Sequence, residues 1–133
     1  MKGYKRNKYL DDLGIPINEY GTNFCDKTDP RWKQWKKERK KYGFDARECW
    51  NLDTMFVEWI YSHFMKYKED CGDKIDLTFY TFTYQDKEVT QKEAIDIICE
   101  ACKEYLLGDF VTRTFLSKDI MVLLKDIMPA MWW

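Results

Sequence analysis

Apolar side chains recur every three or four positions in several stretches of the chain, and this spacing predicts amphipathic helices. The first predicted helix covers residues 30–42. Asp29 is its expected N-cap, Pro30 suits the first helical position, and Gly43 suits the end. Its aromatic residues share one stripe that we expect to face a core: Trp32, Trp35 and Tyr42.

Two longer apolar patterns follow. Residues 54–70 are apolar nearly all round, which is typical of a helix at the centre of a fold. Residues 91–107 begin at a capping box, with Thr90 at the cap and Glu93 three positions later, and end at Gly108. We therefore expect both segments to be helical, with the first one packed on more than one side.

A different period marks the segment between these two helices. Residues 77–84 alternate aromatic and threonine side chains, and a period of two with β-branched and aromatic residues predicts a strand. Residues 85–88 can turn the chain, and Val89 can pair back on the strand. The sequence therefore predicts a short β-hairpin at about residues 77–89.

The last predicted helix covers residues 118–128, with Ser117 as its candidate cap and an optional forward extension over residues 110–116. Together the patterns predict a mainly α (α+β) fold with about four helices and one short hairpin. Residues 1–28 lack sustained periodicity, which predicts an extended N-terminal arm. The expected organisation is this arm followed by a single compact helical domain over residues 29–133.

Composition supports one domain without a membrane segment. The chain has 133 residues, of which 45% are hydrophobic and 17% aromatic. No apolar stretch approaches the roughly 20 residues of a membrane helix, and no apolar region of a signal peptide follows the first residues. We therefore expect no membrane association and a cytoplasmic location.

The charges are unevenly distributed. Residues 1–41 contain twelve lysines and arginines against six acidic residues, whereas residues 42–133 contain ten against seventeen. A basic front half could steer an anion or nucleic acid to one face, or it could be neutralised within the fold or across a subunit interface. The sequence leaves both possibilities open.

The five cysteines form an odd, unevenly spaced set, which favours reduced thiols over a disulfide framework. Cys99 and Cys102 have CxxC spacing, but the chain has no second such pair and a single histidine, His63, so a zinc site lacks ligands. Both cysteines fall in the middle of a predicted helix. We expect them to be buried and structural, and we predict no metal or cofactor site.

The basic helix over residues 30–42 is the first candidate binding surface. Lys37 and Lys40 could neutralise phosphates, and an exposed tryptophan could stack on a base. However, the tryptophans lie on the stripe expected to face the core, and the pI of about 5.9 lies well below the value near 9 of dedicated binders. Nucleic-acid binding is therefore possible but not favoured.

The connector over residues 44–53 is the second candidate. Its carboxylates could hold magnesium and its arginine could clamp a phosphate. The structural alternative, helix capping with an arginine–carboxylate bridge between two helices, is favoured because no spacing here guarantees a metal geometry. The connector contains the remaining candidate residues: Asp45, Arg47, Glu48, Trp50 and Asp53.

Enzymatic activity is the less favoured class, and no catalytic residue is predicted. The sequence has no nucleophile elbow, phosphate-binding glycine loop or Rossmann fingerprint. Its six Trp, nine Tyr and eight Phe exceed what one small core easily encloses, so some should reach the surface as binding anchors or in a homo-oligomer interface. Trp132 and Trp133 must dock on the chain's own core or on a partner, and internal docking is favoured.

Three segments resemble a group of short bacteriophage and prophage proteins, especially of Gram-positive gut bacteria. The first is the connector with its approach, Lys40-Lys41-Tyr42-Gly43-Phe44-Asp45-Ala46-Arg47-Glu48-Cys49-Trp50-Asn51-Leu52-Asp53. The others are the aromatic strand and the closing residues 124–133, which end in Pro-Ala-Met-Trp-Trp. The connector departs from the group's pattern at Ala46, Cys49 and Asn51, where the group has Asp, Thr and Ser. The resemblance covers residues 30–133 and implies a phage origin without a mechanism.

The leading hypothesis is a non-enzymatic binding protein that blocks a bacterial host protein in the infected cytoplasm, as a counter-defence or host-takeover inhibitor. One alternative is a binder of a small anionic nucleotide or of nucleic acid, with Arg47 and the basic helix on phosphate. A second alternative is a metal-dependent enzyme that uses Asp45, Glu48 and Asp53. A homo-oligomer is possible in each case.

Overall fold

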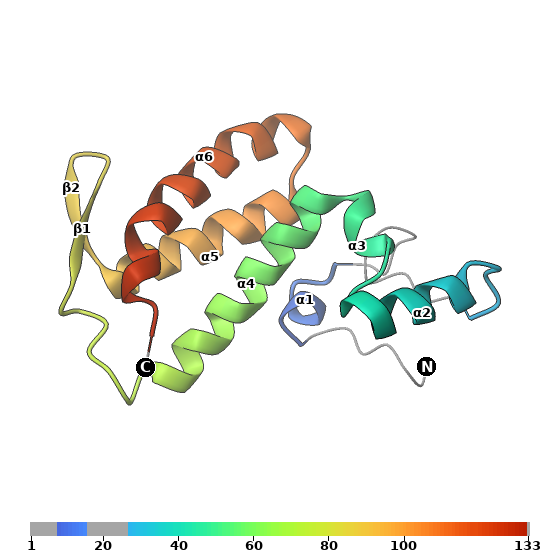
Figure 1. The fold of residues 1–133 in the computed structure, drawn as a ribbon. Coiled ribbons are helices and arrows are strands. Elements are labelled where there is room, and N and C mark those ends of the chain that lie inside the picture. Colours follow the sequence, from blue (N-terminus) through green and yellow to red (C-terminus); the bar gives the residue numbers. More distant parts are fainter. Residues whose placement is uncertain (1–7, 16–26, 133) are drawn as a thin grey trace. The chain divides into compact units, whose positions relative to one another are not determined.

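The computed structural model describes residues 8–15 and 27–132, and within them the chain is mainly helical with one antiparallel hairpin (Figure 1). This confirms the predicted fold class, although the described residues form six α-helices rather than about four. The elements are α1 (Lys8–Asp12), α2 (Trp32–Tyr42), α3 (Arg47–Trp50), α4 (Leu52–Cys71), β1 (Thr81–Tyr84), β2 (Lys87–Thr90), α5 (Gln91–Leu107), α6 (Phe110–Ile127) and the 3-10 helix η2 (Met128–Ala130).

The chain divides into two units, Met1–Val57 and Glu58–Trp133, and the long helix α4 contributes residues to both. Most of the segment predicted to be an extended arm lies outside the described residues. Its described part includes the short helix α1, so Lys8–Asp12 is helical rather than extended. None of the helices in the described ranges is long and apolar enough to span a membrane.

In the first unit, α2 starts two residues later than predicted. The carboxylate of Asp29 accepts a hydrogen bond from the backbone N–H of Arg31 at 2.8 Å, so Asp29 and Pro30 form the turn that leads into the helix. The predicted end is confirmed, because Gly43 adopts a left-handed conformation with φ of 83° and its N–H donates to the carbonyl of Arg39. The start was misplaced because the Asp29 cap bonds to a turn amide rather than to an amide of the helix.

The aromatic stripe of α2 is only partly internal. Trp35 is buried and Trp32 is half-buried, whereas Tyr42 is exposed and its ring lies 6.1 Å from the ring of Phe44. The expectation that Tyr42 faces a core was therefore wrong. Its place at the last helical residue, next to the left-handed Gly43, takes it out of the buried part of the stripe.

The core of the second unit lies between α5 and α6, which run side by side, and the part of α4 that belongs to this unit (Figure 1). An ion pair of 2.9 Å between Lys68 and Asp96 joins α4 to α5. Leu106 of α5 is half-buried, whereas the rest of its apolar stripe is buried: Ala94, Ile95, Ile98, Ala101, Cys102 and Tyr105. The fully buried side chains of this core include Ile60, Ile95, Ile98, Cys102, Ile120, Leu123 and Ile127.

The hairpin is shorter than predicted. Phe82 pairs with Val89, and the turn consists of Gln85 and Asp86 alone, both with positive φ (49° and 60°). The strand begins only at Thr81 because the preceding residues bind the start of α5 instead of a second strand. Specifically, the carbonyls of Leu77 and Tyr80 accept the first two amides of α5.

Both long helices of the second unit begin at side-chain caps. The Thr90–Glu93 capping box is confirmed by its two reciprocal hydrogen bonds. By contrast, α6 begins at Asp109, whose carboxylate accepts the N–H of Thr112 at 2.9 Å. The prediction of Ser117 as a cap was therefore wrong: its hydroxyl donates to the carbonyl of Thr114 inside a continuous helix.

Candidate functional site

The connector between α2 and α4 folds around one buried ion pair. Arg47 and Asp45 are each only 1% exposed. The guanidinium donates to both carboxylate oxygens, at 2.9 Å and 2.6 Å, and the backbone N–H of Arg47 donates to Asp45 as well. This bidentate geometry is the strongest form of an arginine–carboxylate bridge.

Further ion pairs tie this bridge to the neighbouring helices. Arg39 of α2 reaches Asp45 at 2.8 Å and Glu48 at 3.2 Å. The carboxylate of Glu48 accepts the N–H of Asp45, and Glu38 accepts the N–H of Ala46 at 2.8 Å. Within the connector, Arg47–Trp50 form the short helix α3, which the sequence pattern did not predict.

Tryptophan rings enclose the same arginine. The guanidinium of Arg47 lies 4.5 Å from the ring centroid of Trp35 and 5.7 Å from that of Trp32, within the range of cation–π attraction. The guanidinium of a second arginine, Arg31, lies 5.0 Å from the ring centroids of both Trp35 and Trp50. The two arginines and three tryptophans alternate in one chain of contacts, which we call the Arg–Trp cluster.

The Arg–Trp cluster sets the charge state of Asp45. Burial raises the pKa of this carboxyl, but the hydrogen bonds from the Arg47 side chain and backbone, with the charges of Arg47 and Arg39, outweigh that effect. The pKa of Asp45 therefore lies below its ordinary value of 3.8. The carboxylate is ionised at neutral pH and is fully engaged by the two arginines.

This arrangement places the connector residues in a structural role. Arg47 is enclosed, so a phosphate clamp through its guanidinium would require the Arg–Trp cluster to open. Asp53 is exposed, in contrast to the buried Asp45, and Trp50 is half-buried. The structure joins Asp45 and Glu48 through Arg39, but the described residues contain no group of three metal-ligating side chains that could hold an ion.

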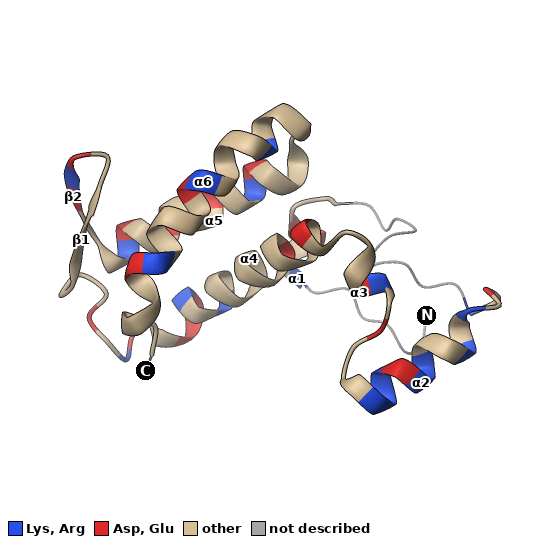
Figure 2. Cartoon of the chain, turned by 45° about the horizontal axis from the view of Figure 1, so that its top comes forward, with Lys and Arg blue, Asp and Glu red and all other residues tan. Residues whose placement is uncertain are grey.

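The remaining candidates, Lys37 and Lys40, lie on the exposed face of α2. Figure 2 shows basic residues along most of this helix, interrupted by one acidic band. Within the described ranges, these exposed lysines form no ion pair with a carboxylate. The basic face consists of Lys33, Lys36, Lys37, Lys40 and Lys41.

Helix α6 carries an exposed apolar face that the sequence pattern did not predict. Phe110 is 83% exposed and Phe115 72%, although the opposite side of the helix supplies buried core residues. The apolar residues Phe110, Val111 and Phe115 precede residue 118 in the sequence, but residues 110–116 were predicted only as an optional extension of the helix. We define the α6 face as Phe110, Val111, Phe115, Met121 and Val122.

Two lysines run along the middle of the α6 face. At about 100° per residue, Phe110 and Met121 lie on one side of the exposed arc and Phe115 on the other. Lys118 and Lys125 project between them, and both are exposed. Several large apolar side chains exposed together on one helix face, with a basic row between them, make this face a candidate interaction site.

The predicted burial of the CxxC cysteines is confirmed. Cys99 and Cys102 are buried in α5, and burial raises their pKa values to about 11 and about 12. Cys71 is also buried, whereas Cys49 is exposed. The CxxC pair therefore has neither the low pKa nor the exposure of a reactive thiol.

Comparisons with protein-family models, with curated proteins and with solved structures found no match to this chain.

Proposed function

We propose that this chain is a non-enzymatic binding protein that uses the α6 face to engage a bacterial host protein in the cytoplasm. The observation that carries the proposal is the exposure of Phe110 and Phe115 on a helix whose other side is firmly held in a core. Aromatic side chains on a rigid helix are effective binding anchors because little conformational entropy is lost when they are covered. The phage resemblance supports a host protein as the target.

The charges of the α6 face define the partner's chemistry. In a symmetric pairing of two α6 faces, Lys118 and Lys125 of one copy would lie against the same lysines of the other, and like charges in a desolvated interface are unfavourable. A surface with apolar pockets and central carboxylates would instead pair with this row. The partner that fits is therefore an acidic, partly apolar surface of a different protein.

Photo-cross-linking in bacterial cells tests this proposal. A cross-linking amino acid replaces Phe115 or Val122 on the α6 face, and in a matched control it replaces Glu104, which is exposed on α5. We expect one host protein to cross-link from both α6 positions and not from position 104. Equal labelling from position 104, or cross-links only between copies of this chain, would overturn the proposal.

Charge reversal then distinguishes a specific interface from non-specific binding. We expect Lys118→Glu with Lys125→Glu to reduce capture of that host protein by about tenfold or more. The matched pair Lys92→Glu with Lys103→Glu reverses two exposed lysines of α5 and should leave capture unchanged. Equal loss in both pairs would contradict recognition through the α6 face.

A second candidate, a binder of nucleotides or nucleic acid, rests on the basic face of α2. Five exposed lysines on one short helix can neutralise several phosphates, and such binding weakens steeply with salt. Native mass spectrometry of the protein purified from bacteria tests this candidate, because a bound nucleotide adds its mass to the 16.2 kDa chain. We expect Lys37→Ala with Lys40→Ala to remove any such adduct if the α2 face holds it.

A further inference from the structure

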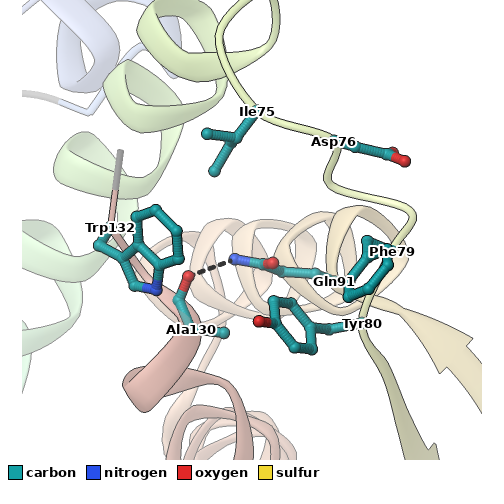
Figure 3. A pocket seen from close by; sticks show the side chains of 7 residues that line it. All are labelled: Ile75, Asp76, Phe79, Tyr80, Gln91, Ala130 and Trp132. Atoms are coloured by element: carbon teal, nitrogen blue, oxygen red, sulfur yellow. Dashed lines mark hydrogen bonds between the residues drawn. The ribbon is translucent and has the colours of Figure 1, made fainter.

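The second unit contains an aromatic pocket of about 260 Å³ that lies between the start of α5 and the C-terminal residues. Figure 3 shows Trp132 on one side, Phe79 and Tyr80 on the other, and the side chain of Gln91 between them. The rings of Phe79 and Tyr80 stand at 89° to each other with centroids 5.0 Å apart, so they form two walls of a corner. Its lining is mainly apolar, and three of its seven residues are aromatic.

Hydrogen bonds fix both sides of this pocket before any ligand arrives. The Nε2 group of Gln91 donates to the carbonyl of Ala130 at 3.1 Å, and the hydroxyl of Tyr67 donates to the carbonyl of Trp132 at 2.9 Å. Burial, assisted by the neighbouring Cys71 thiol, raises the pKa of Tyr67 to about 12, so this phenol keeps its proton. The backbone N–H of Gln91 holds the Tyr80 carbonyl at 3.0 Å on the opposite side.

The side chain of Gln91 is 1% exposed, and its amide group contacts the Ala130 carbonyl, the Met131 sulfur and the Tyr67 hydroxyl. Within the part of the chain that the structure describes, no hydrogen bond reaches its carbonyl oxygen Oε1. A buried amide oxygen without a donor is costly, and it therefore marks the place where a ligand N–H group would be favourable.

The charge at the rim selects the sign of that ligand. Asp76 lies at the edge of the pocket and accepts the N–H and hydroxyl of Thr78, which hold the pKa of Asp76 below its ordinary value. Its carboxylate points away from the centre of the pocket (Figure 3), so it acts through the local potential and not as a direct contact. Aromatic faces and a negative rim both attract cations.

We propose that this pocket binds an alkylammonium group, with the rings of Tyr80 and Trp132 against the cation and Gln91 Oε1 accepting an ammonium N–H. The group can belong to a lysine side chain or to a free small amine, since both present the same chemistry. This site is separate from the α6 face, and neither proposal depends on the other.

Titration of the ¹⁵N-labelled full chain tests the site with defined probes. We expect n-butylammonium to shift the indole N–H of Trp132 and the side-chain amide of Gln91 in a saturable manner. Neutral n-butanol, which has the same apolar chain, should bind at least about tenfold more weakly, because it lacks the cationic contribution. Choline, a quaternary cation without an N–H, should be weaker than n-butylammonium because Oε1 receives no hydrogen bond.

Two further arms complete the experiment. We expect Trp132→Leu to keep an apolar wall but to reduce n-butylammonium affinity by about fivefold to tenfold. The matched control Trp59→Leu changes an exposed tryptophan of α4 outside the pocket and should leave this affinity unchanged. A peptide with one lysine distinguishes the two sources of the alkylammonium group. If the peptide binds as tightly as n-butylammonium, the ligand is a lysine side chain of a protein. If the peptide binds more weakly, the ligand is a free small amine. Equal binding of butanol and butylammonium, or no saturable shift at either residue, would overturn the proposal.

Discussion

Arg47 is a charged side chain in the interior of a unit whose described residues include few buried aliphatic groups. It makes a bidentate ion pair with Asp45 and stacks against Trp35 and Trp32. The desolvation cost of such a pair is large, and the hydrogen bonds between Arg47 and Asp45 offset it only while both partners are present. Losing either member leaves the other charge buried without compensation.

The first prediction concerns the loss of one member of this buried ion pair. We expect Arg47→Ala to lower the free energy of unfolding by about 3–5 kcal/mol, because Asp45 then stays buried without its partner. Lys37→Ala, a change on the exposed face of α2, should stay within about 0.5 kcal/mol of the parent chain. Urea unfolding, followed by hydrogen exchange of α2 and α3 amides, measures both; a mild Arg47→Ala would show that the cluster contributes little.

The pH dependence of stability provides the second prediction. Because the folded pKa of Asp45 lies below 3.8, its ionised form stabilises the folded state at neutral pH. That contribution is lost as the pH falls below the unfolded pKa and through the lower folded value. The stability difference between the parent chain and Asp45→Asn should therefore shrink in acid, whereas the difference for the exposed Glu104→Gln should stay small throughout. A constant Asp45→Asn difference from pH 7 to pH 2 would contradict this role.

At the scale of elements, the sequence predicted those helix ends that depend on a few adjacent residues. The Thr90–Glu93 capping box and the Gly43 terminus were confirmed because each depends on a few adjacent residues. The start of β1 was not predictable, because the carbonyls of Leu77 and Tyr80 are taken by the first amides of α5, in a segment that follows the hairpin. Such competition for backbone groups is invisible to a period-two pattern.

The hairpin turn supplies the third prediction. Gln85 and Asp86 both adopt left-handed conformations, which cost about 1 kcal/mol or more for ordinary side chains. Replacing this pair by Asn-Gly, the preferred pair for such a turn, should raise the free energy of unfolding by about 0.5–1 kcal/mol. Thermal unfolding with hydrogen exchange across β1 and β2 measures the gain. Unchanged protection of these strands would show that the turn does not limit hairpin stability.

On the scale of the whole molecule, the sequence predicted the fold class better than the position of the proposed binding surface. Composition and periodicity were sufficient for a mainly helical chain with one hairpin. They did not separate the buried side of α6 from its exposed side, because Leu123 and Val122 carry the same kind of side chain and only packing distinguishes them. For Arg47 the sequence favoured a structural bridge over a phosphate clamp, but it did not predict the tryptophan rings that enclose the guanidinium.

The exposed side chains of α6, and not those of the connector, are the basis of the proposed function. The connector, which carries the phage resemblance, is occupied by its own ion pairs, whereas α6 exposes large apolar side chains without a role in the core. A surface that keeps Phe110 and Phe115 in water costs solubility, and it is explained if a partner covers those side chains. The central claim is therefore that the α6 face is an interface.

The most direct test is the affinity of the cross-linked host protein, once purified, for the parent chain and for the double variant Phe110→Ser with Phe115→Ser. Both side chains are exposed, so the variant should keep the thermal stability of the parent chain. We expect the double variant to bind the host protein about a hundredfold more weakly, because two aromatic anchors have been removed. An unchanged affinity in a folded variant would contradict this expectation and would assign the binding to another surface of the chain.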